Sequence, residues 1–274
     1  MSSNENLADA TRAKDDEFYT TIETIEKELR NYDWTGKKVF CPCDYESSNF
    51  VSYFRRLGVD VRFRRNPFPV RFDLFGDPIK DQTFETDVEY LDGVNWSDVV
   101  VTNPPFSKIA SFLKTLIASG KRFLFLGPAL LLTTNYCFDV YRKGGFRFGY
   151  NNNRSVPFGR PDGSIESAPV SWYTNLPPGA SVPFVPRRQL SASDLADRDA
   201  FLFVDRYRLF GEPVLYLTSL DEYPVDYWGP VAVPADGLYK LERDGRFIVW
   251  DKIKPFINRQ GKFERVIVTK KPDC

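Results

Sequence analysis

The segment from Ser97 to Leu126 limits the fold of this 274-residue chain more narrowly than any other. Ser97–Thr102 (SDVVVT) and Arg122–Leu126 (RFLFL) are short apolar runs typical of buried strands. Between them, Ile109–Ser119 (IASFLKTLIAS) has a helical pattern, and Gly120 follows as a common helix terminator. A strand, a helix and a second strand joined by short turns predict a unit of a parallel sheet.

The region before residue 64 continues this alternation of helices and strands. Thr20–Arg30 carries apolar residues at i, i+3 and i+7, the pattern of an amphipathic helix. Val39–Asp44 predicts a short buried strand that ends in a turn, Asn49–Leu57 a helix, and Val59–Phe63 a second strand. The sequence therefore predicts an α/β fold: a mostly parallel sheet with helices on both faces.

Composition divides the chain into three parts. Residues 1–14 are polar and are expected to form a flexible leader, whereas residues 15–143 hold the alternating helices and strands of the core. Within residues 144–274, the stretch 144–163 is rich in Gly, Asn, Arg and Pro and the stretch 175–188 in Pro and Gly, and the clearest patterns are strand-like runs at Pro213–Leu217 and Arg265–Val268. We expect this last part to be irregular and β-rich, and to complete the core.

Several classes of function are excluded by composition. The chain has no histidine, which removes Ser-His hydrolases, His-ligated metal enzymes and most general-base schemes near pH 7. Without a histidine, Cys41 and Cys43 make a poor zinc site, so no metal is expected. The 37 basic and 37 acidic residues balance, so any nucleic-acid contact needs a local basic face. No apolar run approaches the ~20 residues of a membrane helix, and no secretory segment follows Met1; a cytoplasmic protein is expected.

Asn103-Pro104-Pro105-Phe106 follows the strand at Ser97–Thr102, at the edge where α/β sheets bind ligands. The two prolines fix φ at about −65° and lack N–H groups, so the loop is rigid and rich in acceptors. An aromatic amine that donates to the Asn103 side-chain oxygen and the Pro104 carbonyl gains a freer lone pair for attack on a sulfonium methyl. Phe106 can stack on the base. The pattern favours a catalytic loop for amino methylation over a plain proline-rich turn.

Together with these features, the sequence resembles the EcoRI-type adenine-specific DNA methyltransferase family. The likeness spans most of the chain in the family's order. It is carried by the segments Asp16–Thr20 (DEFYT), Cys41–Asp44 (CPCD) with Ser48–Phe50, VVVTNPPFS, Ser171–Leu176 (SWYTNL) and Gly261–Ile267 (GKFERVI). The Asn-Pro-Pro-Phe loop alone is also found in RNA and protein-glutamine methyltransferases, whereas the combination is more specific.

The resemblance implies a Rossmann-like, S-adenosylmethionine-dependent enzyme and a role for each matched residue. Catalysis would fall to Asn103, Pro104, Pro105 and Phe106. Cofactor contacts would come from Phe18, Tyr19, Thr20, Cys41, Pro42, Cys43, Asp44, Asn49 and Asp87. Trp172 or Tyr173 would face Phe106 across an extruded adenine. The chain departs from the family pattern at the first strand, where CPCDYESSNF replaces a glycine-rich turn, and at the second, where Arg64-Arg65-Asn66 stands in place of a ribose-binding acid.

The resemblance also implies double-stranded DNA as the partner, in a bacterial or phage-encoded restriction-modification system. Residues 144–274 would contribute target recognition. The candidate DNA contacts are Arg147, Arg154, Arg160, Arg187 and Arg188, because arginines in long loops can reach phosphates and base edges. Two alternatives stay open at this point: an RNA or protein-glutamine methyltransferase, and a DNA-binding relative that has lost catalysis.

Overall fold

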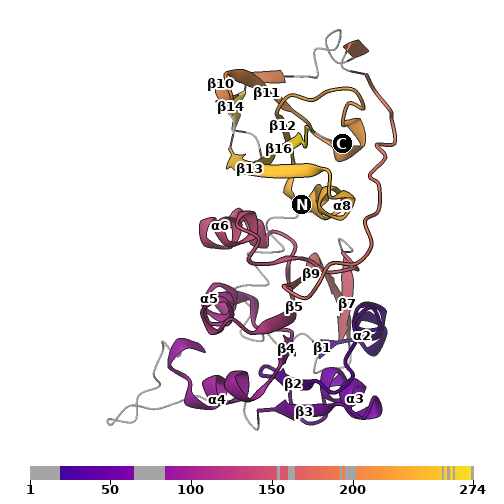
Figure 1. Ribbon diagram of the computed structural model, residues 1–274, viewed down its shortest axis with the longest axis vertical. Coiled ribbons are helices and arrows are strands. Elements are labelled where there is room, and N and C mark those ends of the chain that lie inside the picture. Colours follow the sequence, from indigo (N-terminus) through magenta and orange to yellow (C-terminus); the bar gives the residue numbers. More distant parts are fainter. Residues whose placement is uncertain are drawn as a thin grey trace. The chain divides into compact units, whose positions relative to one another are not determined.

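The chain folds into two compact units, shown in Figure 1. The computed structural model describes residues 19–64, 84–152, 155–159, 164–191, 193–194, 202–254, 256–257, 260–261 and 263–272. The first unit comprises the described residues up to Leu131 together with Gly145–Pro177. The second comprises Leu132–Gly144 and the described residues from Pro178 onward.

The first unit is built on a six-stranded sheet. From one edge to the other its strands are β3 (Asp60–Phe63), β2 (Lys38–Cys41), β4 (Val99–Thr102), β5 (Arg122–Pro128), β9 (Val170–Thr174) and β6 (Arg147–Phe148). The neighbours from β3 to β5 pair in parallel, whereas β9 is antiparallel to both β5 and β6. This confirms the predicted α/β class and its mostly parallel sheet.

Helices cover both faces of this sheet (Figure 1). They are α2 (Ile22–Leu29) and α3 (Asn49–Arg56) on one face, and α4 (Val88–Trp96) and α5 (Ile109–Ser119) on the other. Strand alternation explains the layers: Val99 and Val101 pack with α2 and α3, whereas Phe123 and Phe125 lie on the face of α5. The helices predicted at 20–30, 49–57 and 109–119 are confirmed, and Gly120 ends α5 with φ 65°.

The buried carboxylate of Glu28 connects α2 to Tyr150 and Asn151, two residues that follow β6. Glu28 is fully buried, and its oxygens accept from the Tyr32 hydroxyl at 2.7 Å and from the backbone N–H groups of Tyr150 and Asn151 at 2.8 and 2.7 Å. The Asn151 side chain adds a fourth bond at 2.9 Å. A small antiparallel sheet of β1 (Tyr19–Thr20), β7 (Val156–Gly159) and β8 (Ile165–Ala168) lies beside this region.

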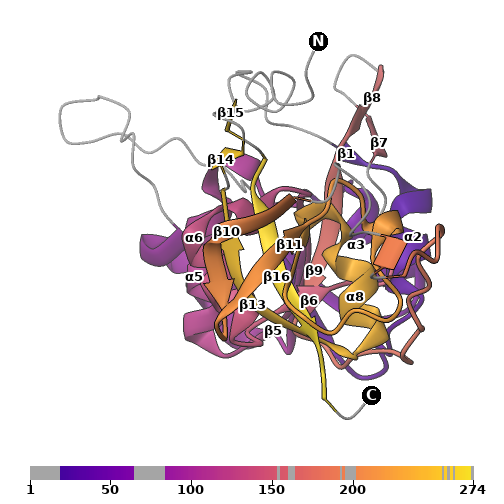
Figure 2. The ribbon, with the colours of Figure 1, turned by 90° about the horizontal axis from the view of Figure 1, so that it is seen from above.

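The second unit holds a five-stranded, mostly antiparallel sheet, and α6 (Asn135–Arg142) and α8 (Leu238–Asp244) lie beside it in the part of the chain that the structure describes (Figure 2). Its strands are β10 (Leu202–Leu209), β11 (Glu212–Tyr216), β12 (Val231–Pro234), β16 (Arg265–Lys270) and β13 (Phe247–Ile253), in that order. Both α6 and α8 contact β13, and β14 (Phe256–Ile257) pairs with β15 (Gln260–Gly261). The strands predicted at 213–217 and 265–268 are confirmed as β11 and β16. In the described residues no helix is long and apolar enough to cross a membrane.

Candidate active site

The connections of the first sheet reverse direction between β2 and β4. From β2 the chain moves outward to β3 on one side, then returns to β4 on the opposite side of β2. In open α/β sheets, ligands bind outside the carboxyl ends of the strands at such a reversal. Cys41 ends β2 and Thr102 ends β4, so the turn after each strand faces the position where a ligand is expected.

The Asn-Pro-Pro-Phe loop leaves β4 at this point and leads directly into a helix. Pro104 and Pro105 are buried, and Pro105 has an extended backbone with φ −59° and ψ 129°. A short 3₁₀ turn, η2 (Phe106–Lys108), follows and runs into α5. Phe106 is partly buried against the core, and the Asn103 Oδ1 atom is shielded from solvent. Packing therefore fixes the loop at the carboxyl edge of the sheet.

Thr102 links this loop to the turn after β2. The Thr102 side chain is completely buried, and its hydroxyl donates to Asp44 Oδ2 at 2.7 Å. The Thr102 Oγ1 atom in turn accepts from the backbone N–H of Cys43 at 3.2 Å. The residue directly before Asn103 thus holds the turn after β2 through two hydrogen bonds. Sequence analysis missed this link, although Thr102 is the polar end of an otherwise apolar strand.

Asp44 is a buried acid at the reversal point. Burial raises the pKa of its carboxyl to about 7, and hydrogen bonds from Thr102 and Ser48 oppose that shift. Cys41 and Cys43 are buried free thiols, and burial raises the pKa of both well above the ordinary value. Both thiols therefore stay protonated at neutral pH, whereas the Asp44 carboxyl titrates near pH 7.

Thr20 and Asn49 are joined by a hydrogen bond, and Asn49 directly follows Ser48, which bonds Asp44. The Asn49 amide donates to the Thr20 carbonyl at 2.9 Å, which ties β1 to the start of α3. The N-cap of α3 is Ser48, which also bonds Asp44. The Thr20 hydroxyl is buried and has no hydrogen-bond partner among the described residues. Of the expected N-terminal motif, Phe18 lies outside the described residues, and only the backbone of Tyr19 is described.

Asp87 has structural partners. Its carboxylate caps α4 by accepting from the Tyr90 N–H at 3.1 Å, and it pairs with Arg64 Nη2 at 2.7 Å. The Arg64 side chain is 2% exposed, so this is a buried ion pair at the carboxyl end of β3. The arginine that replaces the expected ribose-binding acid is therefore neutralised by the acid that was expected to approach cofactor or base.

Trp172 and Tyr173 occupy the core of the sheet. Both lie in β9 between β5 and β6 and are 1% and 0% exposed. The Tyr173 ring packs on Phe125 and Phe148, and its hydroxyl donates to the Pro128 carbonyl at 2.9 Å. A base cannot stack on rings whose faces are already covered, so the base-stacking role expected for these two residues is not supported by the geometry. Phe106 remains the candidate aromatic.

The five candidate arginines have different surroundings. Arg147 donates to the backbone carbonyls of Leu176, Phe148 and Pro177, contacts that hold the end of β9. Arg188 pairs with Glu222 at 2.8 Å, whereas Arg187 lines a cavity of the second unit. Arg154 and Arg160 lie outside the described residues.

Comparison with known proteins identifies the family. The family model described as adenine-specific methyltransferase EcoRI matches residues 6–64 and 78–175, more than half of the chain. The chain belongs to this family, which confirms the resemblance found in the sequence.

Three relatives are similar over most of their length. The type II methyltransferase M.MgeORF184P of Mycoplasma genitalium is 26% identical over 82% of this chain and 79% of its own. M.MpnI of Mycoplasma pneumoniae is 28% identical with the same coverage, and M.EcoRI of Escherichia coli is 26% identical over 87% of this chain and 86% of its own. No solved structure matches.

Proposed function

We propose that this protein is a site-specific DNA methyltransferase that transfers a methyl group from S-adenosylmethionine to the N6 amino group of adenine. The observation that carries the proposal is the position of Asn103–Phe106, at the carboxyl end of β4 and beside the topological reversal. Family membership and the type II methyltransferases among the relatives support it. The parallel sheet with helices on both faces suits the Rossmann-like class of such enzymes.

The residues at the reversal point fit the proposed cofactor. Thr20 offers a buried hydroxyl with no partner in the described part of the chain, and Asp44 offers a buried carboxylate. S-adenosylmethionine carries a sulfonium and an ammonium group, so a carboxylate and a hydroxyl suit its charge and its donors. We assign Thr20, Asp44 and Asn49 to this site, with the backbone of Cys41–Cys43 as its floor. When bound, the cofactor supplies an electrophilic methyl group.

The loop residues then act on the amine of the target base. Asn103 Oδ1 and the Pro104 carbonyl accept hydrogen bonds from the adenine NH2, which favours a pyramidal nitrogen with a localised lone pair. Phe106 stacks on the base and fixes its plane. The methylated nitrogen is cationic and loses a proton readily to water, so a chain without histidine can complete the reaction. Asn103 and Phe106 are therefore the catalytic residues that we propose.

Adenine in a duplex cannot reach a loop at the edge of a sheet without leaving the base stack. We therefore propose that the DNA partner is double-stranded and that the target base is flipped out. Target recognition is assigned to residues 144–274. Of the five candidate arginines, we keep Arg187 and Arg188 as the described residues that contact DNA. Because Arg147 is engaged with backbone carbonyls, we assign it to the fold.

Nucleoside mass spectrometry tests this function. Unmethylated plasmid DNA, total RNA and a glutamine-containing peptide are each incubated with the protein and methyl-labelled S-adenosylmethionine. We expect N6-methyldeoxyadenosine in the digested DNA and no label in the other two. Label in RNA or peptide, with none on DNA adenine, would show that the substrate assignment is wrong.

The cofactor affinity is expected to rise with pH through the pKa of Asp44. That pKa is raised from 3.8 to about 7, so the carboxyl is mostly neutral at pH 6 and mostly ionised at pH 8. If the ionised form holds the cationic cofactor, the affinity increases about tenfold between these values. Calorimetry at both pH values measures this change. Asp44→Asn is the control, because any pH dependence that it retains belongs to the cofactor's own amine. Equal pH dependence in both proteins would contradict the role of Asp44.

The same shift has the opposite sign for folding. The unfolded chain loses this proton near pH 4, whereas the folded protein keeps it until about pH 7. Asp44 therefore lowers the stability of the cofactor-free protein as the pH rises across this window.

A further inference from the structure

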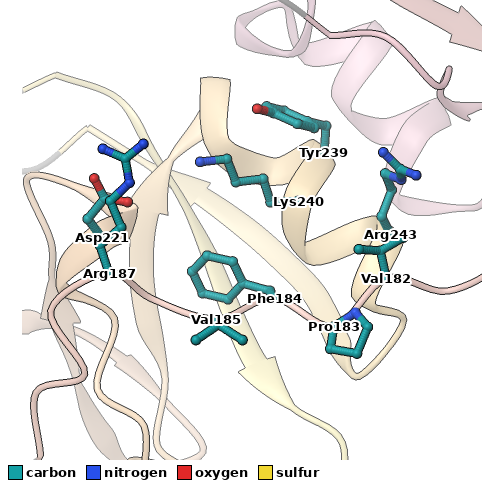
Figure 3. A pocket seen from close by; sticks show the side chains of 9 residues that line it. All are labelled: Val182, Pro183, Phe184, Val185, Arg187, Asp221, Tyr239, Lys240 and Arg243. Atoms are coloured by element: carbon teal, nitrogen blue, oxygen red, sulfur yellow. The ribbon is translucent and has the colours of Figure 1, made fainter.

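A cavity of about 270 Å³ opens in the second unit, remote in sequence from the residues of the candidate active site (Figure 3). An extended segment, Val182–Arg187, forms one wall, and α8 forms the other with Tyr239, Lys240 and Arg243. Asp221 from the 3₁₀ turn η4 (Leu220–Glu222) lies beside Arg187 at one end. Lys240 points from α8 across the Phe184 ring toward that end.

The charge of the lining is unbalanced. Three cationic side chains, those of Arg187, Lys240 and Arg243, face one carboxylate, Asp221. Within the described part of the chain, neither Arg187 nor Lys240 forms an ion pair with a carboxylate. Like charges gathered around one cavity repel unless an anion lies between them. The lining therefore favours an anionic ligand.

The remaining lining is apolar, and its edge is open to solvent. Val182 and Val185 are 46% and 64% exposed, and the Phe184 ring lies between Val185 and Lys240. The cavity volume of about 270 Å³ is just below the range for complete organic ligands, about 300–1,000 Å³. These features suit a part of a polymer that carries a negative charge next to an apolar face. A phosphodiester with its deoxyribose has this chemistry.

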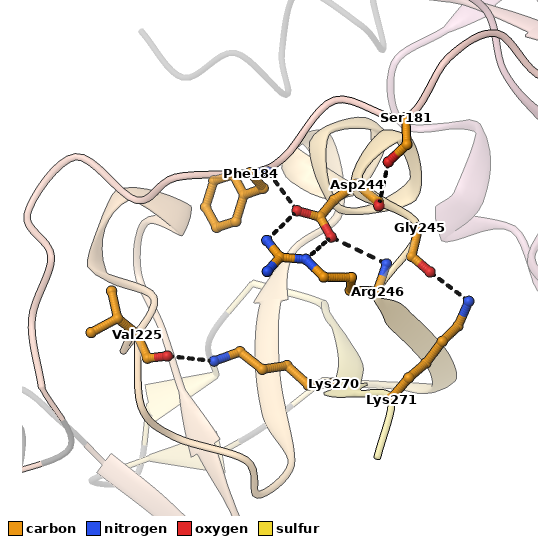
Figure 4. A network of polar contacts seen from close by, with 8 residues as sticks. All are labelled: Ser181, Phe184, Val225, Asp244, Gly245, Arg246, Lys270 and Lys271. Carbon is orange, nitrogen blue, oxygen red and sulfur yellow. Dashed lines mark hydrogen bonds and ion pairs between the residues drawn. The ribbon is translucent and has the colours of Figure 1, made fainter. Parts of the chain in front are cut away.

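Hydrogen bonds hold both walls in place (Figure 4). At the end of α8, the buried Asp244 carboxylate accepts from the Phe184 N–H. The backbone carbonyl of Asp244 accepts from the Ser181 hydroxyl at 2.7 Å. The Arg246 guanidinium completes this network with bonds of 2.6 and 2.7 Å to Asp244. Val182 N–H adds a bond to the Arg243 carbonyl at 2.9 Å. At the other end, the Arg188 N–H donates to the Asp221 carbonyl at 3.2 Å.

We propose that this cavity binds a backbone phosphodiester of the DNA substrate, with Arg187 and Lys240 as the phosphate ligands and Phe184 and Val185 against the sugar. The site rests on the proposed function, since it presupposes a DNA partner. It assigns DNA contact to Lys240 on α8, a residue that the sequence pattern did not single out. Because its walls are fixed before DNA arrives, little ordering is needed on binding.

The test is the salt dependence of DNA affinity. Fluorescence anisotropy with a labelled duplex of mixed sequence is measured from 50 to 300 mM NaCl for the wild-type protein, Lys240→Gln and the matched control Lys254→Gln. Lys254 is an exposed lysine of the same unit that does not line the cavity. Loss of one phosphate contact reduces the slope of log K against log [NaCl] by about 0.9. We expect this reduction and a several-fold weaker affinity for Lys240→Gln, and neither for Lys254→Gln.

Two further variants sharpen the result. Lys240→Gln/Arg187→Gln should lower affinity further, and Asp221→Asn should raise it, because it removes a negative charge beside the phosphate. Equal slopes for Lys240→Gln and Lys254→Gln would overturn the site. Adenine methylation by the wild-type protein is measured in parallel. If methylation occurs and the slopes are equal, the cavity assignment alone fails; if the wild type neither binds nor methylates DNA, the proposed function fails as well.

Discussion

Replacement of Asn103 by alanine is expected to reduce the turnover of DNA methylation by at least about 100-fold, the usual cost of losing one group that stabilises a transition state. Alanine removes the oxygen that we assign to the adenine amine and leaves the backbone of the loop unchanged. Pro104 and Pro105 are buried and fix that backbone independently of the side chain. Cofactor affinity should therefore stay within about twofold of wild type, because the proposed cofactor residues lie on β1, the turn after β2 and α3.

Single-turnover kinetics with labelled cofactor, together with calorimetry, separate the two effects. Asn103→Asp is the informative control, since a carboxylate still accepts hydrogen bonds from an NH2 group. It should retain more activity than Asn103→Ala. A fall in cofactor affinity that accounts for the whole loss in Asn103→Ala would mean that the residue supports the cofactor site and not the base. Wild-type turnover in the same variant would remove the loop from the mechanism.

The part of the site that sequence predicts is the part encoded by adjacent residues. β4, the Asn-Pro-Pro-Phe loop and α5 follow one another along the chain, and their patterns are the apolar run, the paired prolines and the helical period with Gly120 at its end. Local chemistry determines each of these features. The position of the loop at the carboxyl edge of the sheet also follows, once the strands are known to alternate with helices.

Contacts between distant segments could not be predicted in this way. Thr102 and Asp44 are separated by 58 residues, and Arg64 and Asp87 by 23, so nothing in the local pattern pairs them. The ion pair between Arg64 and Asp87 changes the role assigned to both residues. The resemblance gave Asp87 a role toward the cofactor and marked Arg64 as a departure from the family pattern, whereas together they form a buried ion pair, and Asp87 also caps a helix.

Tertiary packing also explains two elements that the sequence analysis did not predict. Gly93 lies inside α4, where glycine normally weakens a helix. A Cβ there would stand 2.3 Å from the Phe40 ring, so packing against β2 requires glycine. β9 carries Trp172 and Tyr173 between β5 and β6; the resemblance implied that these rings face a base, and the pairing that buries them joins segments that are distant in sequence.

Thr102→Val is the second change with a large expected effect, because it alters the connection between the two halves of the site and little else. Valine has the shape of threonine and fits the fully buried position, but it leaves Asp44 Oδ2 and the Cys43 N–H without the hydroxyl that each contacts. Each buried group that loses its partner costs about 1–3 kcal/mol. We expect the free energy of unfolding, measured by denaturant titration, to fall by about 2–4 kcal/mol. Thr102→Ser keeps the hydroxyl and should recover most of it.

A purely structural role would stop at that loss of stability, whereas the proposed link also predicts a change in titration. The Thr102 hydrogen bond lowers the pKa of Asp44 against the effect of burial. Removing it should raise that pKa further above 7, so the pH midpoint of cofactor binding moves to a higher value in Thr102→Val and returns in Thr102→Ser. At pH 7 less of the carboxylate is ionised, and cofactor affinity falls. An unchanged midpoint would show that Thr102 stabilises the sheet without tuning Asp44, and that the catalytic loop and the cofactor turn act independently.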